Sequence, residues 1–294
     1  MKPLRTALFA PGIKERVMTK ALESGADAVI FDLEDSVPVA AKAEARDLVS
    51  RAIAAAAVRA ARPAVYVRVN SAASGMLDAD LSAIVQRGLD GVFLPKAETT
   101  AEVQQTAATL ERLEGERNVS GGSIEIVLMI ESALSVYRCH DMLQASPRVA
   151  TACIGGARDG DLQTDLGCSW SIEGTELLYA RSKVLLDTRA AGKPYPLDGV
   201  YSDLEDEAGL RQDTQLSARL GYVGRTVIHP KQIAPVREAY AVPEKDVTYY
   251  REVIAQFEAA EKTGHAAIVV EGKLVDYAMY ARAKRVLALS ELDR

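Results

Sequence analysis

Three aspartates lie close together in the glycine-rich stretch IGGARDGDLQTDLGC, residues 154–168. Carboxylates at this spacing are candidates for binding a hard metal ion or for moving protons. A calcium loop of the EF-hand type is excluded, because a loop beginning at Asp159 has neither glycine at its sixth position nor glutamate at its twelfth. A P-loop is excluded because no GK[ST] triplet follows the glycine pair. The three residues Asp159, Asp161 and Asp165 must therefore be weighed singly as ligands.

A short helix beginning in the middle of this stretch would give the aspartates different roles. Asp161 would lie in its first turn, nearest the preceding apolar run, and Asp165 one turn further on as a supporting or surface carboxylate. Leu162 and Leu166 would then form the buried stripe of the helix. Asp159 would precede the helix and is the competing metal ligand.

Glu131 ends IEIVLMIE, an otherwise apolar run over 124–131. A strand would carry its carboxylate to a poorly solvated place, where it must be paired, protonated or bound to metal. Oxygen ligands with few protein carboxylates and several waters suit Mg²⁺, or Mn²⁺, rather than zinc.

Arg68, in VYVRVN, is the matching cationic candidate. Its planar guanidinium can hold a substrate carboxylate or a developing oxyanion bidentately. The alternative is a structural partner for nearby aspartates, and both roles are compatible. Other apolar runs also end in charge, which predicts a cation site facing an anion clamp; the residues concerned are Asp32, Glu34, Asp35, Asn70 and Lys96.

Eight apolar runs alternate with helical patterns and must position these residues. Such an order is typical of buried parallel strands, and its regularity favours a (β/α)8 TIM barrel over an open doubly wound sheet. The active site of such a barrel lies at the carboxyl ends of the strands. The expected strands span 6–11, 27–33, 64–70, 91–96, 124–131, 149–155, 197–202 and 223–229, and the expected helices 13–24, 39–60, 77–88, 100–117, 132–144, 173–191 and 206–220.

The last part of the chain breaks this alternation. We expect one barrel domain over 1–238 and a C-terminal helical and hairpin extension over 239–294. The extension should contain a helix at 245–263, a short strand pair around HAAIVVEGKLV, and a final helix at 275–291.

Composition narrows the classes of function. With 48% hydrophobic and 26% charged residues, the chain of 294 residues is globular. Its net charge of -6 argues against an extended nucleic-acid interface, and no apolar run approaches the ~18 residues of a membrane span. Three cysteines without a CxxC pair predict a reducing cytoplasm, with neither disulfides nor a zinc site.

Several motifs in order along the chain resemble one known family. They are LRTALFAPG, GADAVIFDLEDSVPVAAKAEAR, VRVN, LPKAET, IESA, GDLQTDLG, IHPKQI and GKLVDYAMYARAKRVL. Together they resemble the HpcH/HpaI aldolase and citrate lyase β-subunit family, in particular its CitE-like branch. The resemblance implies a (β/α)8 barrel with a Mg²⁺-dependent lyase site, assembled as a homotrimer or hexamer, in which the extension acts as a lid and packs on a neighbouring subunit.

The resemblance also implies roles for single residues. Arg68 falls on the arginine that contacts substrate, and Glu131 on the glutamate that binds the metal. Aligning DLQTDLG selects Asp161 as the second ligand, although ARDG lengthens the approach and keeps Asp159 in competition. Asp276 falls on an aspartate that enters a neighbouring subunit's site, the alternative being a helix N-cap. The glycine pair, Gly155 and Gly156, is expected to let backbone N–H groups approach a substrate carboxylate beside the metal.

The implied reaction cleaves a 3-hydroxyacyl-CoA of the citramalyl-CoA, malyl-CoA or citryl-CoA type into a 2-keto acid and acetyl-CoA. Alternatives are an aldolase acting on a CoA-free 2-keto-3-hydroxy acid, an acyl-CoA thioesterase, and a non-catalytic or carrier-associated subunit of a citrate lyase complex. A Schiff-base aldolase through Lys96 is disfavoured, because paired acidic residues make a metal enolate route sufficient. Basic residues proposed to meet CoA phosphates, with ordinary solvated charges as the alternative, are Arg5, Lys14, Lys42 and Arg46.

Overall fold

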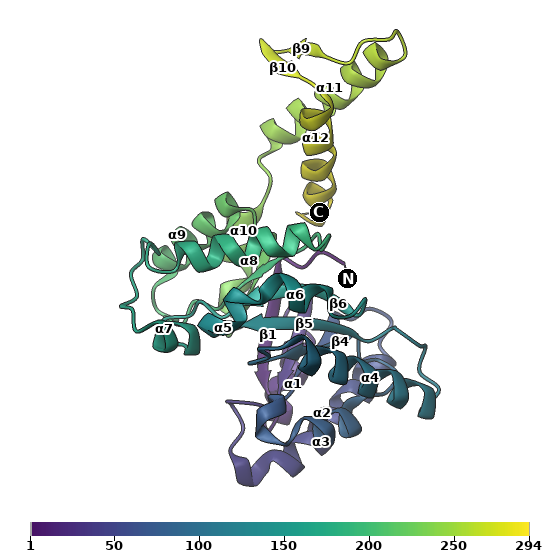
Figure 1. Ribbon diagram of the computed structural model, residues 1–294, viewed down its shortest axis with the longest axis vertical. Coiled ribbons are helices and arrows are strands. Elements are labelled where there is room, and N and C mark those ends of the chain that lie inside the picture. The colour runs from purple at the N-terminus through teal and green to yellow at the C-terminus, as the bar shows by residue number, and fades with distance from the viewer. Residues whose placement is uncertain (1, 294) are drawn as a thin grey trace. The chain divides into compact units, whose positions relative to one another are not determined.

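The computed structural model describes residues 2–293 and divides into two compact units, one ending at Ala239 and the other beginning at Tyr240. Figure 1 shows the chain coloured from the N-terminal barrel in purple and teal to the C-terminal unit in yellow. Each unit has its own buried core.

Eight parallel strands close into a barrel in sequence order, which confirms the predicted (β/α)8 fold (Figure 1). Alternate residues point into the barrel and pack in its interior, where Tyr66 and Phe93 meet edge to face. The strands are β1 (Thr6–Pro11), β2 (Ala28–Asp32), β3 (Ala64–Arg68), β4 (Gly91–Leu94), β5 (Glu125–Ile130), β6 (Val149–Ile154), β7 (Leu197–Asp198) and β8 (Gly224–Val227).

The helices between the strands follow the expected periodicity with one break. The stretch expected as a single helix over 132–144 is two helices that meet at Arg138. The helices of the barrel are α1 (Glu15–Ala21), α2 (Lys42–Ala57), α3 (Leu77–Ile84), α4 (Thr100–Glu116), α5 (Ala133–Tyr137), α6 (Cys139–Gln144), α7 (Asp161–Leu166), α8 (Leu178–Ala190), α9 (Glu207–Leu220) and α10 (Ile233–Tyr240).

Strand β7 is much shorter than the 197–202 run that the sequence predicts. A buried charge network replaces part of the strand ladder there. Arg225 of β8, only 1% exposed, donates to the carbonyl of Gly199 (2.9 Å) and to Asp213 Oδ2 (2.8 Å). Arg181 of α8 joins the opposite oxygen of Asp213 (2.8 Å) to Asp198. Side-chain hydrogen bonds therefore hold the barrel closed where the backbone leaves the sheet.

The C-terminal unit consists of α11 (Glu244–Glu261), an antiparallel hairpin of β9 (Ile268–Val270) and β10 (Lys273–Val275), and α12 (Tyr277–Ser290). Its core is built around Phe257, whose ring stacks on Tyr280 with centroids 4.9 Å apart. No helix within residues 2–293 is long and apolar enough to span a membrane.

Barrel closure between β8 and β1 leaves no room for a side chain at Gly224. A Cβ there would lie 1.9 Å from the carbonyl oxygen of Leu4. We expect Gly224→Ala to lower the free energy of unfolding by about 3 kcal/mol, because the backbone must shift to relieve the overlap. Chemical denaturation followed by circular dichroism measures the change. Gly115→Ala in α4, where an added Cβ meets nothing within 4 Å, is the matched control and should be neutral or stabilise the protein by about 0.5–1 kcal/mol. An unchanged stability of Gly224→Ala would contradict this account of closure.

Candidate active site

A cavity of about 480 Å³ opens at the carboxyl ends of the barrel strands. The charged residues singled out from the sequence share its lining with apolar side chains. This is the end of a (β/α)8 barrel at which the strand-end residues converge. The lining residues include Phe9, Asp32, Asp35, Arg68, Met129, Glu131, Cys153, Gly155, Asp161, Val200 and Ile228.

Strand register places Arg68 beside Asp32, because the two are paired residues of β3 and β2. The Nε and Nη2 atoms of Arg68 donate to the two Asp32 oxygens at 2.7 and 2.8 Å, a bidentate pair. Nη1 of Arg68 also lies 3.1 Å from Asp35 Oδ2, and the guanidinium carbon stands 5.1 Å over the Phe9 ring. Arg68 is thus a structural partner of the aspartates, one of the two roles that the sequence left open, and it also lines the cavity. The other role, binding a substrate carboxylate or oxyanion, stays a prediction.

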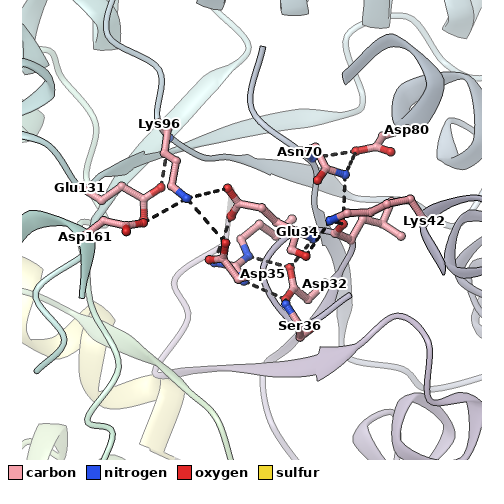
Figure 2. A network of polar contacts seen from close by, with 12 residues as sticks. Asp32, Glu34, Asp35, Ser36, Lys42, Asn70, Asp80, Lys96, Glu131 and Asp161 are labelled. Carbon is pink, nitrogen blue, oxygen red and sulfur yellow. Dashed lines mark hydrogen bonds and ion pairs between the residues drawn. The ribbon is translucent and has the colours of Figure 1, made fainter. Parts of the chain in front are cut away.

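Asp32 in turn shapes the loop after β2. Its carboxylate accepts hydrogen bonds from the backbone N–H groups of Glu34 (2.9 Å) and Ser36 (3.1 Å) (Figure 2). Burial alone would raise the pKa of Asp32, but the Arg68 guanidinium and these N–H donors hold it below the ordinary value. The carboxylate therefore stays charged and keeps the loop closed around Arg68.

Three of the basic residues proposed to meet CoA phosphates have structural roles instead. Lys42 is buried and donates to the carbonyls of Leu33 (2.6 Å) and Glu34 (2.7 Å). Arg46 pairs with the buried Asp80 at 2.7 Å, and Arg5 is buried at the start of β1. Burial and these partners, which lie on other elements, assign the three side chains to the fold instead of to a phosphate. Lys14 is exposed.

Lys96 follows β4 and reaches across the mouth of the barrel (Figure 2). Its ammonium lies 3.1 Å from Asp161 Oδ2, 3.2 Å from Glu34 Oε1 and 3.6 Å from Asp35 Oδ1. Burial by itself would lower the pKa of Lys96, but these carboxylates raise it well above the ordinary value. A Schiff-base aldolase needs a neutral amine, so the ion pairs oppose that alternative.

Glu131 stands at the end of β5 and is only 6% exposed. Its Oε1 accepts the backbone N–H of Lys96 at 3.1 Å. Desolvation, followed by the negative charge of Glu34, raises the pKa of Glu131 to about 8. Gly155 directly follows β6, and a Cβ there would lie 2.6 Å from the Glu131 Cβ. The glycine therefore provides the space in which this carboxylate sits.

The N–H of Gly155 does not face the cavity as the sequence led us to expect. It donates to the carbonyl of Ile130 at 2.8 Å and so belongs to the sheet. Gly156 lies beyond the main cavity, in a smaller pocket with Trp170 and Tyr201. The N–H of Gly155 is used in backbone pairing with β5, which the sequence motif alone does not reveal.

Helix α7 begins at Asp161, with Gly160 as its N-cap, as the sequence predicts. Leu162 is fully buried, but Leu166 is 44% exposed, so the expected two-residue apolar stripe is wrong. Asp161 lines the main cavity and contacts Lys96.

The other two aspartates of the stretch point elsewhere. Asp165 Oδ2 accepts the backbone N–H of Ala133 at 2.6 Å and so caps α5 rather than supporting Asp161. The Asp159 side chain is 83% exposed beside Arg158, and its backbone has a left-handed φ of 59°. Only Asp161 of the three is part of the cavity wall.

Asp276 lies in the C-terminal unit, where it is the N-cap of α12. Its Oδ1 accepts the backbone N–H groups of Ala278 (2.9 Å) and Met279 (3.0 Å). This is the helix-capping role that the sequence offered as the alternative, and Asp276 is exposed on the C-terminal unit.

The donor set fits a hard divalent cation. Glu131 has a buried carboxylate with a raised pKa, and Oε2 of Glu34 is buried without a hydrogen bond although Arg68 Nη1 lies 3.2 Å away. Within the described residues no three acidic, histidine or cysteine side chains converge tightly enough to hold an ion alone. Two carboxylates, Glu131 and Asp161, completed by water or substrate oxygens match the ligation typical of Mg²⁺.

The search for charged residues in the sequence missed the apolar part of the cavity lining. It is formed by Phe9, Met129, Cys153, Val200 and Ile228. Strand alternation offers a signal for the first three, because each lies one or two residues before the end of a strand and faces the barrel interior. Val200 lies beyond the short β7, where no strand pattern points inward.

Comparison with known proteins agrees with this architecture. Residues 5–230 match the family model of HpcH/HpaI aldolase/citrate lyase, and residues 183–292 match that of the C-C bond lyases of the TIM-barrel fold. Citrate lyase subunit beta of Leuconostoc mesenteroides subsp. cremoris is 35% identical over 98% of this chain and 94% of its own. A (3S)-malyl-CoA thioesterase of Cereibacter sphaeroides is 31% identical over 98% of this chain and 95% of its own.

A solved structure shows the same fold over the full length. It is protein CitE from Mycobacterium tuberculosis in complex with magnesium, acetoacetate and coenzyme A, 26% identical, with a TM-score of 0.75 over 98% of each chain. The closed barrel, the cavity at its strand ends and the match to the family model all point to the same family. The chain belongs to the HpcH/HpaI aldolase/citrate lyase family and is a carbon–carbon lyase.

Proposed function

We propose that this protein cleaves a 3-hydroxyacyl-CoA of the citramalyl-CoA, malyl-CoA or citryl-CoA type into a 2-keto acid and acetyl-CoA, with Mg²⁺ or Mn²⁺ bound by Glu131 and Asp161. The observation that carries this proposal is the buried Glu131 carboxylate facing the same cavity as Asp161 and Arg68. The relatives that act on a CoA thioester and the neighbour that holds magnesium and coenzyme A support it.

The cavity walls suit a substrate with one anionic end and a less polar remainder. Arg68 lines the cavity and uses three of its five N–H donors on Asp32 and Asp35, so the remaining two can bind a carboxylate or the oxygen that becomes the keto group. A bound divalent ion supplies Lewis-acid stabilisation of that oxygen. The apolar wall of Phe9, Met129 and Val200 excludes water from the carbon that loses its bond.

When the hydroxyl passes its proton to water at the mouth of the barrel, the bond between the α- and β-carbons breaks, and its electron pair passes to the α-carbon as a thioester enolate. That carbon then needs a proton. We assign this step to Asp276 of a neighbouring subunit in a homotrimer or hexamer. The C-terminal unit exposes an apolar pair across its hairpin, Val269 and Leu274, each 66% exposed, immediately before Asp276. A neighbouring barrel that covers this pair would receive the carboxylate at its mouth.

The thioesterase among the relatives favours a second candidate function, hydrolysis of the CoA thioester. In that reaction Asp276 would activate water instead of protonating an enolate. An aldolase acting on a CoA-free acid is the remaining alternative.

The free cysteines, two of them buried, support a reducing cytoplasmic setting.

A panel of malyl-, citramalyl- and citryl-CoA assayed with Mg²⁺ separates these activities. We expect release of keto acid without free thiol, abolished by chelation and restored by Mg²⁺. Hydrazone formation measures the keto acid, and a thiol reagent measures free CoA. Release of free thiol without keto acid would establish the thioesterase, and turnover of only CoA-free acids would establish the aldolase.

Substitution of the two proposed metal ligands should abolish turnover without unfolding the barrel. We expect Glu131→Gln and Asp161→Asn each to lower kcat/KM by at least about a hundredfold, since the ion and its charge stabilisation are lost. Asp159→Asn is the matched control two residues away and should remain within about threefold of the parent protein. Loss of activity in Asp159→Asn with normal activity in Asp161→Asn would reverse the assignment.

Mixing two inactive variants tests whether Asp276 acts across subunits. Glu131→Gln is a better barrel partner than Arg68→Ala, because removing Arg68 would leave Asp32 buried without its counter-charge. Subunit exchange between Asp276→Asn and Glu131→Gln should restore activity at about one quarter of the sites in a ring in which each site uses two chains. The same mixture without exchange is the control. An absence of recovery after verified exchange would show that Asp276 does not complete a neighbour's site.

A further inference from the structure

Lys96 contacts both proposed metal ligands, one through its backbone and one through its side chain. The N–H donates to Glu131 Oε1 at 3.1 Å, and the ammonium lies 3.1 Å from Asp161 Oδ2. Figure 2 shows the ammonium between Asp161 on one side and Glu34 and Asp35 on the other. A positive charge already stands at the position where the acidic residues of the site converge.

The backbone of Lys96 has a left-handed conformation, with φ of 53°. This conformation disfavours side chains other than glycine and persists where surrounding contacts impose it. Here the turn after β4 aims the N–H at Glu131, and the side chain then extends over the cavity. A glycine would satisfy the backbone better, so the presence of lysine points to a use for its ammonium.

The cations of the site differ in how freely they can move. Arg68 is tied to both oxygens of Asp32 with its side chain only 12% exposed, and Lys42 is buried against two carbonyls. The Lys96 side chain is 38% exposed, and its ammonium contacts each of its carboxylate partners through one oxygen only. A flexible four-carbon stem lets an ammonium change partners, whereas a bidentate guanidinium does not. Lys96 is therefore the exchangeable cation.

We propose that Lys96 is a positioning residue that serves as the internal counter-cation of the metal site. Its ammonium neutralises Asp161 and Glu34 while no divalent ion is bound, and it yields Asp161 to the ion on binding. Lys96 thereby competes with the ion and sets the concentration at which the site fills. This inference rests on the proposed function, because it takes Glu131 and Asp161 as the ligands.

Titration of the full-length protein with Mn²⁺, with free ion measured by electron paramagnetic resonance, tests the proposal without substrate. We expect Lys96→Met to bind Mn²⁺ roughly tenfold more tightly than the parent protein, since a positive charge near the ligands is removed. Lys96→Arg keeps the charge and should stay near the parent affinity. Lys183→Met removes an ammonium from an ion pair with Asp187 in α8 and is the matched control, expected to leave the affinity unchanged.

A second variant and a second readout keep the test decisive. Lys96→Gln should show the same tightening as Lys96→Met, and both should melt at a lower temperature without Mn²⁺ but regain more stability on adding it. Unchanged or weaker binding in both variants would overturn the role of Lys96 while leaving the metal ligands intact. A parent protein that binds no Mn²⁺ would overturn the proposed function together with this inference.

Discussion

The site depends on the bidentate pair between Arg68 and Asp32 at the mouth of the barrel. The two residues are partners in adjacent strands, so the register that closes the sheet also brings the opposite charges together. Once paired, Asp32 still accepts two backbone N–H groups and holds the following loop against the guanidinium. Burying an arginine without this partner would cost stability, and the partner also fixes the guanidinium as a rigid part of the cavity lining.

The other charged side chains of the site differ in how far they are exposed to solvent. Glu131 is nearly buried, Lys96 is partly exposed, and Asp161 is half exposed on the first turn of α7. Burial raises the pKa of Glu131, which means that a cation near this carboxylate is favoured over an isolated charge. The site therefore combines a guanidinium held rigidly by carboxylates with the carboxylates of Glu131 and Asp161, an arrangement compatible with the metal-dependent lyase activity that we propose.

Much of the barrel could be predicted from the sequence because buried parallel strands leave a strong pattern. Seven of the apolar runs match strands closely, and charged residues at their ends meet in one cavity, as they must in any such barrel. The failure at β7 has a physical cause. There the closure relies on Arg181 and Arg225 bound to Asp198 and Asp213, and ion pairs between distant residues have no local periodicity.

The sequence by itself determined the fold class, the family resemblance and the chemical types gathered at the strand ends, because periodicity and residue identity are local properties. Only the tertiary structure decided what each charge touches. Lys42 donates to a backbone carbonyl and Arg46 pairs with Asp80, although both were candidates for phosphate binding or for solvated surface charges. Asp165 caps a helix instead of supporting Asp161. Lys96 contacts the carboxylates of Glu131 and Asp161. Partners of a charged side chain are set by strand register and burial, which bring together residues that lie far apart along the chain.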